Sequence, residues 1–178
     1  MKKQMNKQEK SEEIRIIAFG PISQYLNSAT LPAMLNFKSR KVARIGLGED
    51  HAVFLFIGFE VAVSGKNDRG QLGIPINDEG TNKEYNGLVL HDHERFIEEK
   101  RRVIDVAAGI NHTMFLTEPT QPDPESKEDP RKVYVCGARD MLGKFSTKDA
   151  FEPKPVEIER LSEDPELKIK YIFSANEK

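Results

Sequence analysis

The chain has little cysteine, little net charge and no long apolar run. Its 178 residues include one cysteine, Cys136, which excludes an internal disulfide and a zinc cluster built from cysteines. A reducing compartment is the default, so we expect an intracellular protein, cytoplasmic or cytoskeletal, with the nucleus as an alternative. The longest apolar run, residues 52–59, is too short to cross a bilayer. The net charge of −2 gives no overall attraction to nucleic acid or anionic lipid.

The chain divides into a polar start and a longer remainder. Residues 1–13 carry charges of both signs and lack the apolar centre of a signal peptide, so we predict a disordered polar tail there. Residues 14–178 are enough for one ordinary domain or a piece of a larger one. Hydrophobic residues make up 38% and charged residues 31% of the sequence, which is polar for a globular domain but not typical of disorder.

A ten-residue block recurs along the chain. VARIGLGEDH at 42–51 aligns with VIDVAAGINH at 103–112, and a fainter copy, IKYIFSANEK, occupies 169–178. Successive copies are offset by 61 and 66 residues. Self-similarity at such a period indicates supersecondary units stacked on one another, so it predicts a repeat fold.

A second repeated element, a short β-type run closed by glycine, alternates with this block. It occurs at 16–20, 61–65 and 133–137. Short runs rich in aromatic and branched residues also follow two histidines, at 52–56 and 113–117. With a weaker run in the variable stretch, each repeat offers about four short strands. Four antiparallel strands per repeat is the pattern of a β-propeller blade.

Two stretches interrupt the strand pattern. Residues 93–106 show some helical periodicity, through Phe96, Ile97 and Val103, and predict one short helix or turn. Residues 118–132 hold four prolines among acidic side chains, so they cannot form a helix or a central strand. We expect a surface loop there, inserted between two strands of one hairpin.

The stretch at 65–75 is rich in turn-forming residues. Leu72 is the apolar residue of its Gly-Gln-Leu-Gly core, and we expect it to point into the blade. A phosphate-binding P-loop would need Gly-Lys-Ser/Thr after its spacer, whereas here Gln71 follows Gly70. The pattern therefore predicts a tight turn. The turn formers are Gly65, Asn67, Asp68 and Gly70.

These motifs together resemble the repeats of the regulator of chromosome condensation family. The shared pattern is strand-Gly-x-Asn-x-x-Gly-Gln-Leu-Gly, a variable stretch, and Val-x-x-Val-Ala-x-Gly-x-x-His-Thr. It is matched best at 61–75 and 103–117, and less well at 133–143, which lacks the Gly-Gln pair. The resemblance implies an all-β fold: a partial β-propeller of this type, with four-stranded antiparallel blades and an incomplete ring.

The resemblance also implies blade limits of about 14–60, 61–132 and 133–178, the last incomplete. Seven repeats usually close the ring in this family, and this chain has about two and a half. We therefore expect a fragment of a longer repeat protein. The alternatives are a ring closed with other chains and an open edge that docks on a partner.

The histidines are candidates for catalysis or metal binding. His51 and His112 occupy equivalent repeat positions, so we expect structural roles, with each imidazole bonded to backbone at its corner. His91 and His93 could pair as metal ligands on one face of a strand, but no third ligand stands with them, and we expect a solvated polar stretch. We expect a buried, inert thiol at Cys136 and no catalytic, metal or cofactor site.

The glycines and histidines that recur are expected to be structural. These structural repeat positions are Gly48, His51, Gly65, Gly70, Gly73, Gly109, His112, Gly137 and Gly143.

The sequence predicts a non-enzymatic β-propeller scaffold for protein–protein interaction. Repeats build a frame while variable loops carry recognition, and the loops we favour are 76–93 and 118–132. The family resemblance implies an alternative, a guanine-nucleotide exchange factor for a Ran-like small GTPase. Another alternative is a structural component of a cytoskeletal or ciliary assembly. The expected partner is a protein, with a small GTPase as the alternative, and neither nucleic acid nor a membrane span is predicted.

Overall fold

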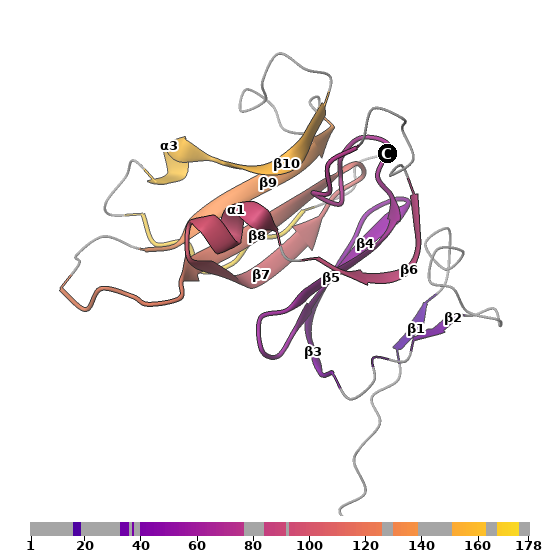
Figure 1. Cartoon of the computed structure of the whole chain (residues 1–178), viewed down its shortest axis with the longest axis horizontal. Helices are drawn as coiled ribbons and strands as arrows, with labels where there is room; N and C mark the ends of the chain where they lie inside the picture. The colour runs from indigo at the N-terminus through magenta and orange to yellow at the C-terminus, as the bar shows by residue number, and fades with distance from the viewer. Residues whose placement is uncertain are drawn as a thin grey trace, which may run out of the picture.

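The computed structural model describes residues 16–18, 33–35, 37, 40–76, 84–91, 93–125, 130–138, 151–162 and 167–174. Two four-stranded antiparallel sheets form its main body (Figure 1). The first contains β3 (Val42–Leu47), β4 (His51–Phe56), β5 (Val61–Lys66) and β6 (Glu84–Leu90). The second contains β7 (Arg101–Ala108), β8 (His112–Pro119), β9 (Lys132–Ala138) and β10 (Phe151–Glu157). The smaller elements are the pair β1 (Ile16–Ala18) and β2 (Ala33–Leu35), and the helices α1 (Glu94–Glu98) and α3 (Glu159–Ser162).

Each main sheet is a meander in which every strand pairs with the next one along the chain. The register repeats between the sheets, since His51 lies opposite Gly65 in the first and His112 lies opposite Gly137 in the second. The predicted all-β architecture of four-stranded antiparallel blades is confirmed. The two described sheets do not close into a ring.

The limits of these sheets differ from the blade limits expected at 14–60, 61–132 and 133–178. The expected boundaries fall inside the β4–β5 and β8–β9 hairpins, whose strands pair directly. The expected blade at 61–132 thus combines the last two strands of the first sheet with the first two of the second. A sequence period sets the length of a repeat but not its phase, because the phase depends on which strands pair.

The two sheets share one apolar core. β4 and β5 supply Val53, Leu55 and Val63, and β8 and β9 supply Phe115 and Tyr134, all of them buried. β3 and β4 both contact β7, and α1 packs on β7 as well. The alternation of strand side chains places these residues on one face of each sheet, so the sheets are joined by burial of apolar surface.

Three features predicted between the strands are present in the structure: the buried Leu72, a short helix and a loop. Leu72 is fully buried in the shared core. The short helix predicted within 93–106 is α1, which ends early because Arg101 begins β7. Residues 120–131 connect β8 to β9 within one hairpin, as predicted, and Thr117 pairs with Lys132 across it. The loop was expected from 118, but Glu118 and Pro119 end β8 and pair with β7.

Both sheets also carry apolar residues on their other faces. Phe37 packs against the first sheet, in contact with Phe54. Ile169 and Ile172 pack on the second sheet beside Leu116, and the amide of Ile172 donates to Asp105 on β7. Residues 169–174 of the third copy of the repeated block therefore lie against the second sheet. No helix in the described part of the chain is long and apolar enough to span a membrane.

Candidate functional site

The first histidine corner lies between β3 and β4. His51 is fully buried, and the amide of Gly48 donates to its carbonyl at 2.9 Å, which closes the turn. The imidazole lies against Gly48 so closely that a Cβ there would stand 2.1 Å from His51 Cε1 and 2.6 Å from the carbonyl oxygen of Gly109. Gly48 is therefore required for close packing, and not for its backbone angles.

The second corner repeats this arrangement between β7 and β8. The amide of Gly109 donates to the carbonyl of His112, again at 2.9 Å. A Cβ at Gly109 would stand 2.0 Å from His112 Cε1 and 2.6 Å from Ser174 Oγ. The recurrence of glycine and histidine three residues apart is thus explained by an imidazole that occupies the space of a side chain at the glycine.

Each imidazole bonds a hydroxyl 62 residues further along the chain. His51 Nε2 lies 3.0 Å from Thr113 Oγ1, and His112 Nε2 lies 3.1 Å from Ser174 Oγ. The expected partner was backbone at the same corner, so this expectation was wrong in detail. Thr113 belongs to the second sheet and His51 to the first, so the bond joins neighbouring sheets.

The Thr113 hydroxyl fixes the tautomer of His51. Its single hydrogen is donated to the carbonyl of Gln71 at 2.7 Å, so the hydroxyl accepts from His51 Nε2–H. Burial lowers the pKa of His51 to about 4, despite the nearby carbonyl of His112, which raises it. Burial lowers the pKa of His112 too. His51 is therefore a neutral hydrogen-bond donor that connects the two sheets.

A histidine beside a hydroxyl is also the beginning of a nucleophilic site. Here His51 and Thr113 are both fully buried, and the hydroxyl is already committed to the carbonyl of Gln71. A nucleophile must reach its substrate with its proton directed at the base. The geometry therefore supports a structural bridge at this position.

The glycines that end the strand runs need their unusual backbone. Gly65 and Gly137 have φ of +104° and +122°, which other residues rarely adopt. A Cβ at either would stand 2.2 Å from a carbonyl oxygen, that of Asp50 or Asn111 respectively. Of the remaining positions, Gly70 and Gly73 lie in successive turns of 65–75, while Gly143 lies outside the described residues.

Asn67 and Gln71 hold the turn at 65–75 from inside. The Asn67 side chain accepts from the amide of Leu72 at 3.0 Å and donates to the carbonyl of Ile74 at 2.8 Å. The Gln71 side-chain oxygen accepts from the amide of Arg69 at 2.8 Å, while its backbone carbonyl accepts the bond from Thr113. Sequence reasoning recognised Asn67 only as a turn former and used Gln71 only to exclude a P-loop. The signal was present, since an Asn or Gln side chain among turn-forming residues is able to bond the backbone of the turn.

The histidine pair after β6 is not the solvated stretch that was expected. His93 is 3% exposed, and its ring lies 4.7 Å from that of Phe115 and 5.1 Å from that of Phe96, between centroids. The His91 ring lies 4.0 Å away, and its Nε2 is 3.3 Å from the Gly73 carbonyl oxygen. Burial lowers the pKa of His93 well below its usual value, and His91 adds to this. Among the described residues, no three His, Cys, Asp or Glu side chains are placed to hold a metal ion.

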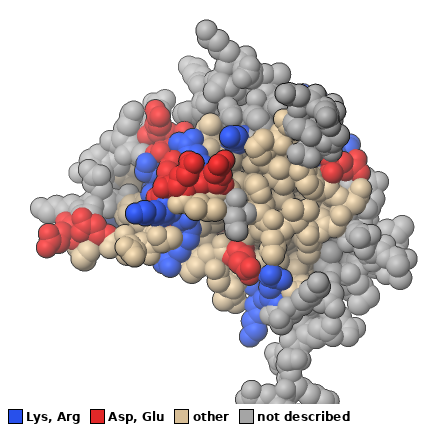
Figure 2. All heavy atoms as spheres, in the orientation of Figure 1, with Lys and Arg blue, Asp and Glu red and all other residues tan. Residues whose placement is uncertain are grey.

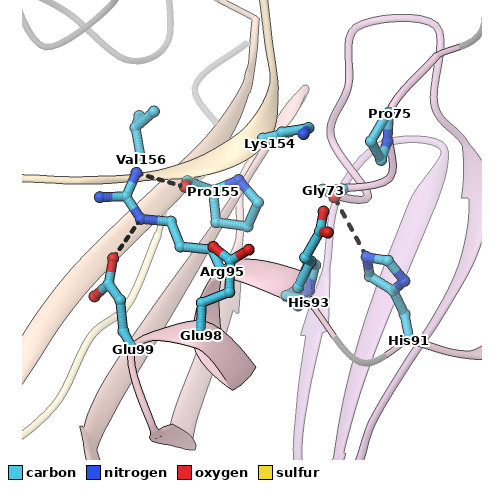
Figure 3. A pocket seen from close by; sticks show the side chains of 11 residues that line it. Gly73, Pro75, His91, His93, Arg95, Glu98, Glu99, Lys154, Pro155 and Val156 are labelled. Atoms are coloured by element: carbon cyan, nitrogen blue, oxygen red, sulfur yellow. Dashed lines mark hydrogen bonds and ion pairs between the residues drawn. The ribbon is translucent and has the colours of Figure 1, made fainter.

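A pocket of about 560 Å³ adjoins this pair (Figure 3). It lies between α1, β10 and the end of the turn at 65–75, so both sheets contribute to it. Arg95 on one wall donates to Glu99 at 2.8 Å and to the carbonyl of Pro155 at 3.3 Å. Burial would raise the pKa of Glu99, but hydrogen bonds from Tyr134 and Arg95 lower it overall. These bonds attach α1 to the second sheet.

Comparisons with known proteins identify the fold. No family profile and no curated protein sequence matches the chain. Among solved structures, human WBSCR16 is 19% identical, with a TM-score of 0.53 over 79% of this chain and 33% of its own. Yeast RCC1 (Prp20) bound to Kap60 is 20% identical, with a TM-score of 0.56 over 91% of this chain and 36% of its own.

Prp20p of Saccharomyces cerevisiae, studied with its binding to Gsp1p and histones, gives a TM-score of 0.52 at 19% identity over 90% of this chain. This chain spans about a third of the length of these neighbours. At such identity the likeness concerns the fold. The chain therefore has the fold of part of an RCC1-like β-propeller, and the resemblance expected from its repeats is confirmed.

Proposed function

We propose that the chain is a non-enzymatic interaction scaffold whose partner is a protein. The observation that carries this proposal is the way the buried polar groups are used. His51, Thr113 and Gln71 bond one another and join two sheets, so they hold a frame together. A rigid frame positions the connections that lie outside its strands, and recognition resides most often in such connections.

The loop between β8 and β9, residues 120–131, supports the proposal most directly. Its ends are fixed, because Thr117 pairs with Lys132 and Arg101 donates to the carbonyl of Pro130 at 2.5 Å and to the Thr117 side chain at 2.7 Å. A loop held at its base can vary in sequence without disturbing the sheet. The stretch at 76–93, expected as a second loop, instead contains β6 and ends at the buried His93, so it is joined to the first sheet and to the core.

The test replaces residues 120–129 in the full chain with a scrambled sequence that keeps the prolines. Partners are identified by cross-linking and mass spectrometry for both proteins, and their folding is compared by thermal unfolding. We expect unchanged unfolding and loss of the cross-linked partner. If the scrambled chain retains every cross-linked partner, residues 120–129 do not carry the recognition.

A guanine-nucleotide exchange factor for a Ran-like GTPase is the second candidate, favoured by the fold shared with Prp20. It would bind the GTPase and loosen its nucleotide without covalent chemistry of its own. The test mixes the chain with such a GTPase loaded with fluorescent GDP. Faster release than from the GTPase alone would support exchange, and an unchanged rate would remove this function for the chain.

A further inference from the structure

The pocket between α1 and β10 contains a buried polar group without a partner. His93 lines the pocket and is 3% exposed, yet neither of its ring nitrogens has the geometry of a hydrogen bond with a described group. The Gly73 carbonyl is near enough to oppose the fall in the pKa of His93, but burial outweighs it. A neutral imidazole has one donor and one acceptor, and buried polar groups are nearly always satisfied. An unsatisfied imidazole at a pocket wall is a group that a ligand can bond.

Two carboxylates without partners also line this pocket. Glu94 and Glu98 lie one helical turn apart on α1, and neither forms an ion pair with a described basic residue. Figure 2 shows acidic side chains gathered over α1. Like charges at this spacing destabilise a helix, and a cation bound between them would remove the repulsion.

The remaining walls fit a methylene chain. Pro75, Pro155 and Val156 are apolar residues of the lining, and the Glu98 side chain rises from α1 toward the space between Pro155 and His93 (Figure 3). The volume of about 560 Å³ is within the range of sites that bury a side chain or a small molecule, and is far larger than a single ion.

We infer that this pocket binds an arginine side chain presented by a partner protein. The guanidinium lies between the carboxylates of Glu94 and Glu98 and donates to a ring nitrogen of His93, while its methylenes contact the proline walls. Arginine suits the site better than lysine because its planar head offers five donors in fixed directions. This inference rests on the proposed scaffold function, to which it adds the chemistry of one contact.

Two basic residues of this chain, Arg95 and Lys154, also line the pocket and affect the binding of an arginine. Arg95 is engaged by Glu99, so it does not neutralise the two free carboxylates. Lys154 also lines the pocket and is exposed. Its ammonium opposes a second cation, so its removal strengthens the binding of arginine.

The test measures binding of two blocked tripeptides to the full chain by NMR titration. The first is acetyl-Gly-Arg-Gly-amide, and the second carries citrulline, which has nearly the same shape without the charge. We expect binding of the arginine peptide, with shifts at α1 and His93, and at least about tenfold weaker binding of the citrulline peptide, since hydrogen bonds to charged groups are the stronger ones. No binding of the arginine peptide, or equal binding of both, overturns the inference.

Variants locate the site. Glu94→Gln/Glu98→Gln weakens binding of the arginine peptide about tenfold or more, whereas Glu49→Gln/Glu84→Gln, with the same change in net charge outside the pocket, leaves it unchanged. His93→Phe keeps an aromatic ring in place and weakens binding, and Lys154→Gln strengthens it. Wild-type affinity in the first double variant, or an equal loss in the control, overturns the inference. Either failure leaves the scaffold proposal intact, because that is tested at residues 120–129.

Discussion

Replacing Thr113 with valine tests whether the buried bridge joins the two sheets. Valine has nearly the shape of threonine but no hydroxyl, so His51 Nε2–H and the Gln71 carbonyl both lose their partner. Each buried group left unsatisfied costs about 1–3 kcal/mol, so the variant should lose about 2–6 kcal/mol. Since a domain is commonly stable by about 5–15 kcal/mol, this loss is a large fraction of the total.

The matched control is Thr113→Ser, which keeps the hydroxyl and removes one methyl group. Its expected cost is about 1 kcal/mol, from the lost apolar contact. Urea unfolding followed by circular dichroism measures both variants, and similar slopes would show that the same surface is exposed. If Thr113→Val is no less stable than Thr113→Ser, the hydroxyl does not bridge the sheets and the reasoning fails.

Three further predictions concern the corners and α1. Gly109→Val should lower the free energy of unfolding by more than about 2 kcal/mol, because a Cβ would stand 2.0 Å from His112 Cε1; thermal unfolding beside an exposed control, Lys41→Ala, decides this. The pKa of His51 is about 4 in the folded chain, against 6.5 in the unfolded chain. Between these pH values the unfolded chain binds more protons. The free energy of unfolding should therefore be highest above pH 6.5 and fall by about 3 kcal/mol as the pH drops to 4. Urea midpoints measured across this window test the sign, and stability that rises on acidification would refute it. Tyr134→Phe should cost about 1–2 kcal/mol by removing the bond to Glu99, and an unchanged unfolding midpoint would show that this bond contributes nothing.

Local sequence patterns were sufficient to predict the repeat and several of its strands and turns. Short runs rich in aromatic and branched residues predicted β4, β5, β8 and β9, whereas β10 was not predicted. Glycine marked the ends of β5 and β9 because Gly65 and Gly137 adopt positive φ. The prolines of 118–132 predicted the loop between β8 and β9, although the first of them, Pro119, ends β8. These features depend on residues near in sequence, so a single sequence contains them.

The phase of the blades and the environment of His93 were not predictable in this way. The boundary between sheets depends on pairing, and the same period fits any phase. His93 looked solvated because its neighbours in sequence are charged. Its burial depends on Phe115, which belongs to the second sheet and approaches only after the sheets have packed.

The sequence by itself determined that the chain is a repeat of short strands with recurring glycine and histidine positions. It could do so because β-strand alternation, turn formation and the space beside glycine are local properties of the backbone. Only the tertiary structure decided that His51 bonds Thr113 and that His93 is left unpartnered beside a pocket. The physical reason is that hydrogen bonds and burial between two sheets join residues far apart in sequence, and no local pattern records which of them will meet.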